Sequence, residues 1–198
     1  MSAPPPPYAA SDYWERRYAA RTDEDIFEWY LPFEVLRPHL LRALPSTSLR
    51  ILHVGSGNSA LPEDMHTHGF TDQLANDISP SVIARMAERT AHRRGLRWSV
   101  EDALAMPHAT GSWDAVVDKG TFDALSTSHQ DRKLVAEVYR ILRPGGIYAL
   151  FSSLESTALA FGPPFWNGGE WQPIRSTCIA NDGTECWLHC ATKSGGAG

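Results

Sequence analysis

Glycine and acidic residues follow short apolar runs of the sequence, where the chain could turn toward a ligand. Gly55-Ser56-Gly57 comes directly after the first run, and glycines there let the backbone approach a ligand with no side chain between. Asp77 ends the second run, roughly 20 residues after Gly55, a spacing typical of a carboxylate that accepts hydrogen bonds from ribose hydroxyls. This pattern predicts a site for an adenosine-containing ligand.

Two further runs end in residues of the same kind. Asp102 follows the third run and could accept a hydrogen bond from an adenine amino group. Asp118, Lys119 and Gly120 follow the fourth run. If the four runs are parallel strands, all these residues meet at the carboxyl edge of one sheet, where ligands of such sheets bind.

The glycine loop alone leaves other interpretations open. The spacing of Gly55, Gly57 and Ala60 also fits the dinucleotide fingerprint of a nicotinamide oxidoreductase, or a tight turn that binds nothing. Acidic or glycine residues after four successive runs argue against the empty turn. The small size, the absence of a substrate domain and the hairpin expected at the end of the sheet argue against the oxidoreductase.

Strand and helix patterns alternate along the chain and would position these residues. Ser79 is expected to cap a helix that has Pro80 at its first position. Asp12 and Glu15 have capping-box spacing, which predicts a short helix from there. The other predicted helices cover residues 32–44, 61–68 and 131–142, and the predicted strands cover residues 50–54, 70–76, 96–100, 113–117 and 147–151.

The expected fold class is a doubly wound α/β domain with a mostly parallel, seven-stranded, Rossmann-like sheet. Residues 175–180 and 185–191 flank the turn sequence Asn181-Asp182-Gly183, so the sheet should end in an antiparallel hairpin. Residues 1–10 contain a Pro4–Pro7 tract and predict a disordered tail. Residues 11–198 are expected to form a single domain.

Composition limits the partners that the protein can have. The formal net charge of −5 indicates no general affinity for nucleic acid or an anionic membrane, and no apolar run is long enough to span a bilayer. The three cysteines all lie beyond residue 177, which favours a reducing compartment over a disulfide framework. We expect a cytoplasmic monomer.

Several segments together resemble the class I S-adenosylmethionine-dependent methyltransferases. More narrowly, they are similar to the group of the endothelin-converting-enzyme-2-related lysine methyltransferase and the methyltransferase-like 13 domains. The likeness runs from about Asp12 to about Lys193. The segments are residues 51–59 (ILHVGSGNS), 77–79 (DIS), 117–124 (VDKGTFDA) and 142–146 (LRPGG), with residues 13–18 (YWERRY) and 28–30 (EWY) near the N-terminus.

The resemblance implies S-adenosyl-L-methionine as the cofactor and assigns residues to its parts. Trp14, Tyr18 and Trp29 would close over it, Gly55 would line the methionine moiety, and Lys119 would lie near it. Asp77 and Ile78 would hold the ribose and one adenine face, and Asp102 and Ala103 the adenine edge. With the residues indicated by the strand ends, the predicted cofactor-binding set is Trp14, Tyr18, Trp29, Gly55, Ser56, Gly57, Asp77, Ile78, Asp102, Ala103, Asp118 and Lys119.

Two positions depart from the related patterns. Position 53 is His where many class I enzymes outside this group carry an acidic residue. Ser56 stands where close relatives have Cys. Neither departure removes a contact on which the prediction depends.

The sequence offers no compelling catalytic base, and Asp118 and Asp123 are the candidates for orienting a substrate. The resemblance implies a protein lysine as the methyl acceptor, with elongation factor 1-alpha as the leading candidate. A small-molecule N-, O- or S-methyltransferase is the alternative, and a non-catalytic scaffold is a more distant one. Residues 162–169 form a loop of the kind that selects substrates. Aromatic residues that could line an acceptor pocket are Trp113, Phe122, Phe165, Trp166 and Trp171.

Two groups of residues in the sequence have side chains of the kind that bind metals. His66 and His68 lie near Glu63 and Asp64 on a predicted surface helix, where residues two apart diverge. Cys186 and Cys190 would share one face of a strand, with His189 on the other. The sequence therefore predicts no metal site.

Overall fold

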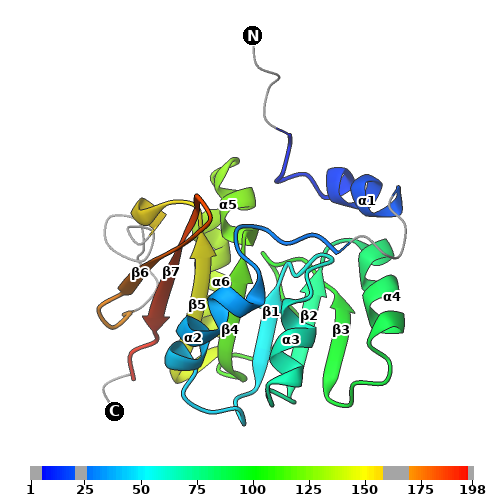
Figure 1. The fold of residues 1–198 in the computed structure, drawn as a ribbon. Coiled ribbons are helices and arrows are strands. Elements are labelled where there is room, and N and C mark those ends of the chain that lie inside the picture. The colour runs from blue at the N-terminus through cyan, green and yellow to red at the C-terminus, as the bar shows by residue number, and fades with distance from the viewer. Residues whose placement is uncertain (1–5, 21–25, 158–169, 196–198) are drawn as a thin grey trace.

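The computed structural model describes residues 6–20, 26–157 and 170–195 of the 198-residue chain. Their centre is one seven-stranded sheet with the order β3-β2-β1-β4-β5-β7-β6 (Figure 1). The five strands from β3 to β5 are parallel, and β7 lies antiparallel between β5 and β6. The strands are β1 (Ile51–Val54), β2 (Gln73–Asp77), β3 (Leu96–Val100), β4 (Trp113–Lys119), β5 (Leu142–Ser152), β6 (Arg175–Asn181) and β7 (Thr184–Thr192). The predicted fold class is confirmed.

Helices cover both faces of the sheet, because alternate strand residues are apolar on each side. On β4, Ala115 and Val117 join the core under α2 and α3, whereas Val116 joins the core under α5 and α6. The fourth helix, α4, packs against β2 and β3. The helices are α1 (Ser11–Ala19), α2 (Phe33–Ala43), α3 (Leu61–Thr67), α4 (Pro80–Arg89), α5 (Thr121–Ser126) and α6 (Asp131–Ile141).

The start of α1 differs from its prediction. Its N-cap is Ala10, which makes no side-chain cap, so Asp12 and Glu15 do not form a capping box. Asp12 instead pairs with Arg16 at 2.9 Å, one turn along the helix. The Glu15 carboxylate accepts hydrogen bonds from Ser79 and Ser81 at the start of α4, a tertiary contact that competes with the local cap.

The N-terminal tail also differs from expectation. Tyr8 was assigned to a disordered stretch, yet its ring stacks on Trp14 with centroids 5.7 Å apart. Its carbonyl accepts a 2.6 Å hydrogen bond from Trp14 Nε1. The expectation for residues 1–5 lies outside the described residues.

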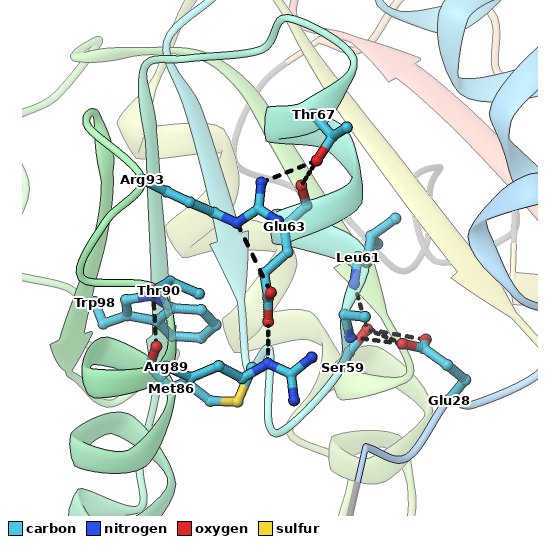
Figure 2. A network of polar contacts seen from close by, with 11 residues as sticks. Glu28, Ser59, Leu61, Glu63, Thr67, Met86, Arg89, Thr90, Arg93 and Trp98 are labelled. Atoms are coloured by element: carbon cyan, nitrogen blue, oxygen red, sulfur yellow. Dashed lines mark hydrogen bonds and ion pairs between the residues drawn. The ribbon is translucent and has the colours of Figure 1, made fainter. Parts of the chain in front are cut away.

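Polar contacts join α3 to α4 and fix the loops that precede these helices. Figure 2 shows the Glu63 carboxylate of α3 between Arg89, at 2.7 Å, and Arg93, at 3.8 Å. Arg93 also donates to Thr67 at 2.9 Å. Below them Trp98 of β3 donates to Thr90 Oγ1 at 2.7 Å, so that β3 and the end of α4 are held together. No helix among the described residues is long and apolar enough to cross a membrane.

Two glycines have similar positive φ angles but different surroundings. Substituting each by alanine distinguishes the cost of a strained backbone angle from the cost of a steric clash. Gly95, between α4 and β3, has φ +88°, and a Cβ added there would lie 1.9 Å from the Thr71 carbonyl oxygen. Gly183, in the hairpin turn, has φ +79° and open space around it. We expect Gly183→Ala to lower the free energy of unfolding by about 1–2 kcal/mol, the cost of a left-handed L-residue.

Gly95→Ala should cost more, about 3 kcal/mol or above, since the backbone of β2 or β3 must also shift. Urea unfolding of both variants checks this. Equal losses of unfolding free energy in the two variants would show that the contact between a Cβ at position 95 and the Thr71 carbonyl oxygen is relieved without further cost.

Candidate cofactor site

The predicted strand ends meet at one open cavity at the carboxyl edge of the sheet. Glycine turns, acidic strand ends and N-terminal aromatic rings all contribute to its wall. The predicted cofactor residues that line it are Trp14, Tyr18, Trp29, Gly55, Ser56, Gly57, Asp77, Ile78, Asp102, Ala103 and Lys119. Their common location is observed, and their contact with a cofactor stays a prediction.

The turn after β1 requires glycine at two positions. Gly55 and Gly57 have φ of +58° and +52°, a region that L side chains rarely adopt. A Cβ on Gly55 would lie 2.1 Å from Thr121 Oγ1, and one on Gly57 would lie 2.3 Å from Tyr18 Oη. The turn is therefore packed between α5 and the N-terminal segment, and its backbone faces the cavity.

Asp77 fixes this turn from the end of β2. Its Oδ2 accepts a 2.9 Å hydrogen bond from Gly57 N, and its Oδ1 accepts one of 3.0 Å from Ser79 N. The side chain is buried, and burial raises the pKa of the carboxyl group to about 6, although the backbone N–H donors act in the opposite direction. At neutral pH it is a carboxylate on the cavity wall, able to accept hydrogen bonds from a diol.

The end of β3 supplies two acidic residues, of which the sequence analysis selected one. Asp102 is exposed, and its Oδ1 accepts from Leu104 N at 2.8 Å. Glu101 also lines the cavity but is buried, and it accepts a 2.8 Å bond from Asn76 Nδ2. Asn76 Oδ1 in turn accepts from Gly55 N at 3.0 Å, so Glu101 and Asn76 stabilise the glycine turn. In the sequence, Glu101 is indicated by its position directly before Asp102.

Aromatic residues of the N-terminal segment cover the cavity. Trp14 stacks on Tyr18 with centroids 5.8 Å apart, and Tyr8 meets Trp29 edge to face at the same separation. Figure 1 shows α1 beside α4 at one end of the sheet, and hydrogen bonds from Ser79 and Ser81 hold Glu15 there and lower its pKa. Tyr8 and Phe27 also line the cavity and were missed. Only their aromatic character in a flanking segment could have indicated them.

Lys119 reaches the cavity from the end of β4, and its ammonium contacts the carboxylate of Glu28. Burial lowers the pKa of Lys119 to about 7, whereas Cys186 of β7 acts in the opposite direction. Glu28 also accepts hydrogen bonds from Ser59 Oγ, at 2.9 Å, and Ala60 N, at 2.6 Å. In the sequence, Glu28 is part of the Glu28-Trp29-Tyr30 signature, and no local pattern indicates its role.

Asp118 does not belong to the cavity wall, which corrects its assignment as a cofactor residue. Neighbouring strand residues point to opposite faces, so Asp118 and Lys119 diverge. The buried Asp118 carboxylate accepts from Tyr148 Oη at 2.8 Å and from Thr121 N at 2.9 Å. Burial raises the pKa of Asp118 to about 7. Asp118 thus stabilises the link between β4, α5 and β5.

Asp123 lies outside the cavity as well, so the structure supports neither candidate for orienting a substrate there. Its carboxylate accepts hydrogen bonds from Tyr30 Oη at 2.8 Å, Ser152 Oγ at 2.6 Å and Ser153 N at 2.9 Å. Tyr30 has φ +64°, a strained angle for a bulky residue. Asp123 therefore holds the N-terminal segment against the end of β5.

Of the predicted acceptor aromatics, the three that the structure describes do not line the cavity. Trp113 and Phe122 are buried in the core under α6, and Trp171 packs edge to face on Tyr139 at 5.0 Å. Phe165, Trp166 and the loop of residues 162–169 lie outside the described residues. No group of three or more potential metal ligands occurs in the described part of the chain.

Fold and cavity define a class: a doubly wound α/β protein with an open cavity at the carboxyl edge of its sheet, bordered by a glycine turn after β1 and a buried carboxylate at the end of β2. Residues 52–150 match the family described as "Methyltransferase domain". The chain belongs to this family, and the predicted S-adenosylmethionine-dependent methyltransferase class is confirmed, with S-adenosylmethionine as its cofactor. The oxidoreductase alternative is thereby set aside.

Particular relatives refine this picture. The chain is 38% identical over 166 residues to EEF1A lysine methyltransferase 4 of Bos taurus, covering 78% of this chain and 64% of that protein. It is 34% identical over 182 residues to the eEF1A lysine and N-terminal methyltransferase of Danio rerio, covering 90% of this chain and 26% of that protein. The chain thus spans less than two thirds of these relatives. The N-methyltransferase NodS from Bradyrhizobium japonicum WM9 shares the fold, with a TM-score of 0.62 at 21% identity over 82% of this chain and 97% of that one.

Tyr148→Phe tests the structural role of Asp118. The variant removes one hydrogen bond to a buried carboxylate, so the free energy of unfolding should fall by about 1–2 kcal/mol. The affinity for S-adenosylhomocysteine should stay within about twofold of wild type, because neither Asp118 nor Tyr148 lines the cavity. Urea unfolding and calorimetry measure the two quantities. A tenfold loss of affinity without a loss of stability would return Asp118 to the cofactor site.

Proposed function

We propose that this chain transfers a methyl group from S-adenosylmethionine to a lysine side chain of a protein, with eEF1A as the leading substrate. The observation that carries the cofactor part is the buried Asp77 carboxylate, hydrogen-bonded to the glycine turn at the cavity wall. The lysine part is supported by relatives named as eEF1A lysine methyltransferases. A monomer in the cytoplasm is the setting we propose, in keeping with that substrate.

The cavity residues account for the binding of the cofactor. Asp77 would accept hydrogen bonds from the ribose hydroxyls, and Asp102 or Glu101 would meet the adenine amino group. The Gly55 turn would lie against the amino-acid part, with Trp14, Tyr18 and Trp29 above. This arrangement leaves the ends of β4 and β5 as the side from which an acceptor arrives.

Methyl transfer depends more on the alignment of the acceptor with the methyl group than on acid–base catalysis. The cofactor supplies a methyl group on a sulfonium, which is already an activated electrophile. Asp77, the Gly55 turn and the N-terminal aromatic residues would hold the cofactor so that this methyl group faces the lone pair of an incoming lysine nitrogen. In-line positioning of this kind is worth roughly 7–11 kcal/mol.

The acceptor must first be neutral. A free lysine has a pKa of about 10.4, so deprotonation at pH 7 costs roughly 4–5 kcal/mol. The aromatic wall of Trp14, Trp29 and Phe27 would lower that cost, because an apolar surround disfavours the ammonium. A wall of this kind also supports a neutral alkylamine acceptor over an anionic one.

Asp77→Asn tests the cofactor pose. Loss of the charged acceptor should weaken S-adenosylhomocysteine binding roughly tenfold or more, since hydrogen bonds to a charged group contribute about 1.5–3 kcal/mol. Wild-type affinity should also fall as pH drops below about 6, where the Asp77 carboxylate of the free protein is protonated. Calorimetry measures both effects.

The matched control is Asp182→Asn, which makes the same change in the hairpin turn, at a residue that does not line the cavity. It should bind like wild type at every pH. An Asp77→Asn variant with wild-type affinity would contradict the proposed pose.

Label transfer tests the acceptor. Purified enzyme with methyl-labelled S-adenosylmethionine should label a protein band in lysate that comigrates with eEF1A, and mass spectrometry should place the methyl group on a lysine. Asp77→Asn serves as the reduced-activity control. Label confined to the low-molecular-weight fraction would exclude the lysine proposal and support a small-molecule acceptor.

A further inference from the structure

A tyrosine hydroxyl lies at the edge of the cavity where β4 passes into α5. Gly120 lines the cavity there, and a Cβ added to it would lie 3.5 Å from Tyr30 Oη and 3.6 Å from Trp29 Cγ. Because glycine has no Cβ, no side chain of residue 120 separates this hydroxyl from the cavity. Tyr30 itself does not line the cavity, so its hydroxyl borders the site at Gly120.

The backbone at Tyr30 adopts an unusual angle that brings the hydroxyl to this place. Tyr30 has φ +64°, which bulky residues rarely adopt. Neighbouring side chains of an extended chain point to opposite sides, yet Trp29 and Tyr30 both approach Gly120. Strained residues concentrate at functional sites, where the surrounding contacts hold them in place. The strain at Tyr30 therefore indicates a role for its contact with the cavity edge.

The hydrogen of the Tyr30 hydroxyl is committed to Asp123. Asp123 Oδ2 accepts from Tyr30 Oη at 2.8 Å, and the same carboxylate accepts from Ser152 Oγ at 2.6 Å and Ser153 N at 2.9 Å. A carboxylate only accepts hydrogen bonds, so the tyrosine must be the donor. Burial, and then the charge of Asp123, raise the pKa of the hydroxyl, so it keeps its proton.

A hydroxyl in this state can only accept further hydrogen bonds. Among the residues that the structure describes, none donates to Tyr30 Oη, so its oxygen has lone pairs to offer at the cavity edge. An amine carries N–H donors, and an amine that donates one of them to Tyr30 Oη keeps its own lone pair for the methyl group. An ether or a thioether has no such hydrogen. The arrangement therefore favours a nitrogen acceptor that bears hydrogen.

We propose that Tyr30 Oη accepts a hydrogen bond from the amine that receives the methyl group, and that Asp123 is the positioning residue that holds the hydroxyl in this orientation. The proposal rests on the proposed function, because it assumes that the acceptor arrives at the ends of β4 and β5. Tyr30 would touch the acceptor, whereas Asp123 acts only through Tyr30.

Two ligands that differ in one hydrogen-bond donor test this by binding alone. Both are analogues of S-adenosylhomocysteine in which nitrogen replaces the sulfur and carries a short alkyl linker. In the amine analogue the linker continues into a secondary alkylamine, which mimics the lysine nitrogen and bears N–H whether neutral or protonated. In the ether analogue an oxygen takes the place of that amine. Calorimetric titration into the full chain gives the ratio of the two affinities.

Tyr30→Phe should reduce the preference for the amine analogue over the ether analogue roughly tenfold, the effect of one hydrogen bond to a charged or polar donor. Its affinity for S-adenosylhomocysteine should stay within about twofold of wild type. If Tyr30 only held the N-terminal segment in place, the variant would weaken the binding of all three ligands alike and leave the ratio unchanged. Thermal unfolding confirms that each variant is folded.

Tyr148→Phe is the matched control. It removes the hydroxyl from a second tyrosine–aspartate hydrogen bond, to Asp118 at 2.8 Å, and neither of these residues lines the cavity. Its preference for the amine analogue should equal that of wild type. A preference that falls equally in both tyrosine variants would contradict a specific role for Tyr30.

Two variants of Asp123 test its action through Tyr30. Asp123→Ala frees the Tyr30 hydrogen, which can then be donated to an ether oxygen, so the preference for the amine analogue should fall. Asp123→Asn keeps an oxygen that can accept from Tyr30, so the preference should return to within about threefold of wild type. A preference lost in Asp123→Asn but kept in Tyr30→Phe would assign it to the carboxylate charge and overturn the proposal.

The outcomes separate this proposal from the proposed function. Wild-type protein that does not bind S-adenosylhomocysteine would overturn the proposed function. Wild-type protein that binds S-adenosylhomocysteine but binds the two analogues equally would overturn the role of Tyr30 alone, and this comparison requires no variant to fold. A Tyr30→Phe variant that keeps the wild-type preference would overturn that role as well.

Discussion

The hydrogen bonds accepted by the buried Asp77 carboxylate are the interaction on which the cavity depends. One oxygen holds Gly57 of the turn after β1, and the other holds Ser79 at the start of α4. Ser79 in turn binds Glu15 of α1. A loop, a helix start and the N-terminal segment thus meet at one residue, and an uncompensated buried charge there would be costly. The carboxylate that suits a ribose is also the one that builds the site around it.

Two adjacent residues on β4 point to opposite faces of the sheet and have different roles. Asp118 points toward Tyr148 and the start of α5, and Lys119 points toward Glu28 and the cavity. The first connects the sheet to the helix that closes the turn, and the second gives the cavity its cation. Because the side-chain period of a strand is two, adjacent residues within a strand point to opposite faces of the sheet. Asp118 therefore does not line the cavity that Lys119 reaches.

Regular patterns allowed the sheet, its terminal hairpin and the Gly55 and Asp77 elements to be predicted from local sequence. The helix α5 was missed because six residues carry too little periodicity to be recognised. The roles of Glu15, Glu28 and Tyr8 could not be predicted, since each depends on a partner that only the tertiary fold brings near. The capping box of Asp12 and Glu15 failed for the same reason: two serines on α4 offered Glu15 stronger donors than the helix did.

Residues of the candidate cofactor site come both from the matched family region and from the N-terminal segment outside it. Residues 52–150 carry the glycine turn, Asp77 and Lys119, but not Glu28 or the aromatic residues Tyr8, Trp14 and Trp29. The nucleoside end of the cavity is therefore built by the shared sheet, whereas its cover and the partner of its cation come from the N-terminal segment. Since Trp29 packs over Gly120, where β4 passes into α5, that segment also borders the side from which an acceptor arrives. In the proposed pose, cofactor binding and acceptor access would both depend on this one stretch of chain outside the matched region.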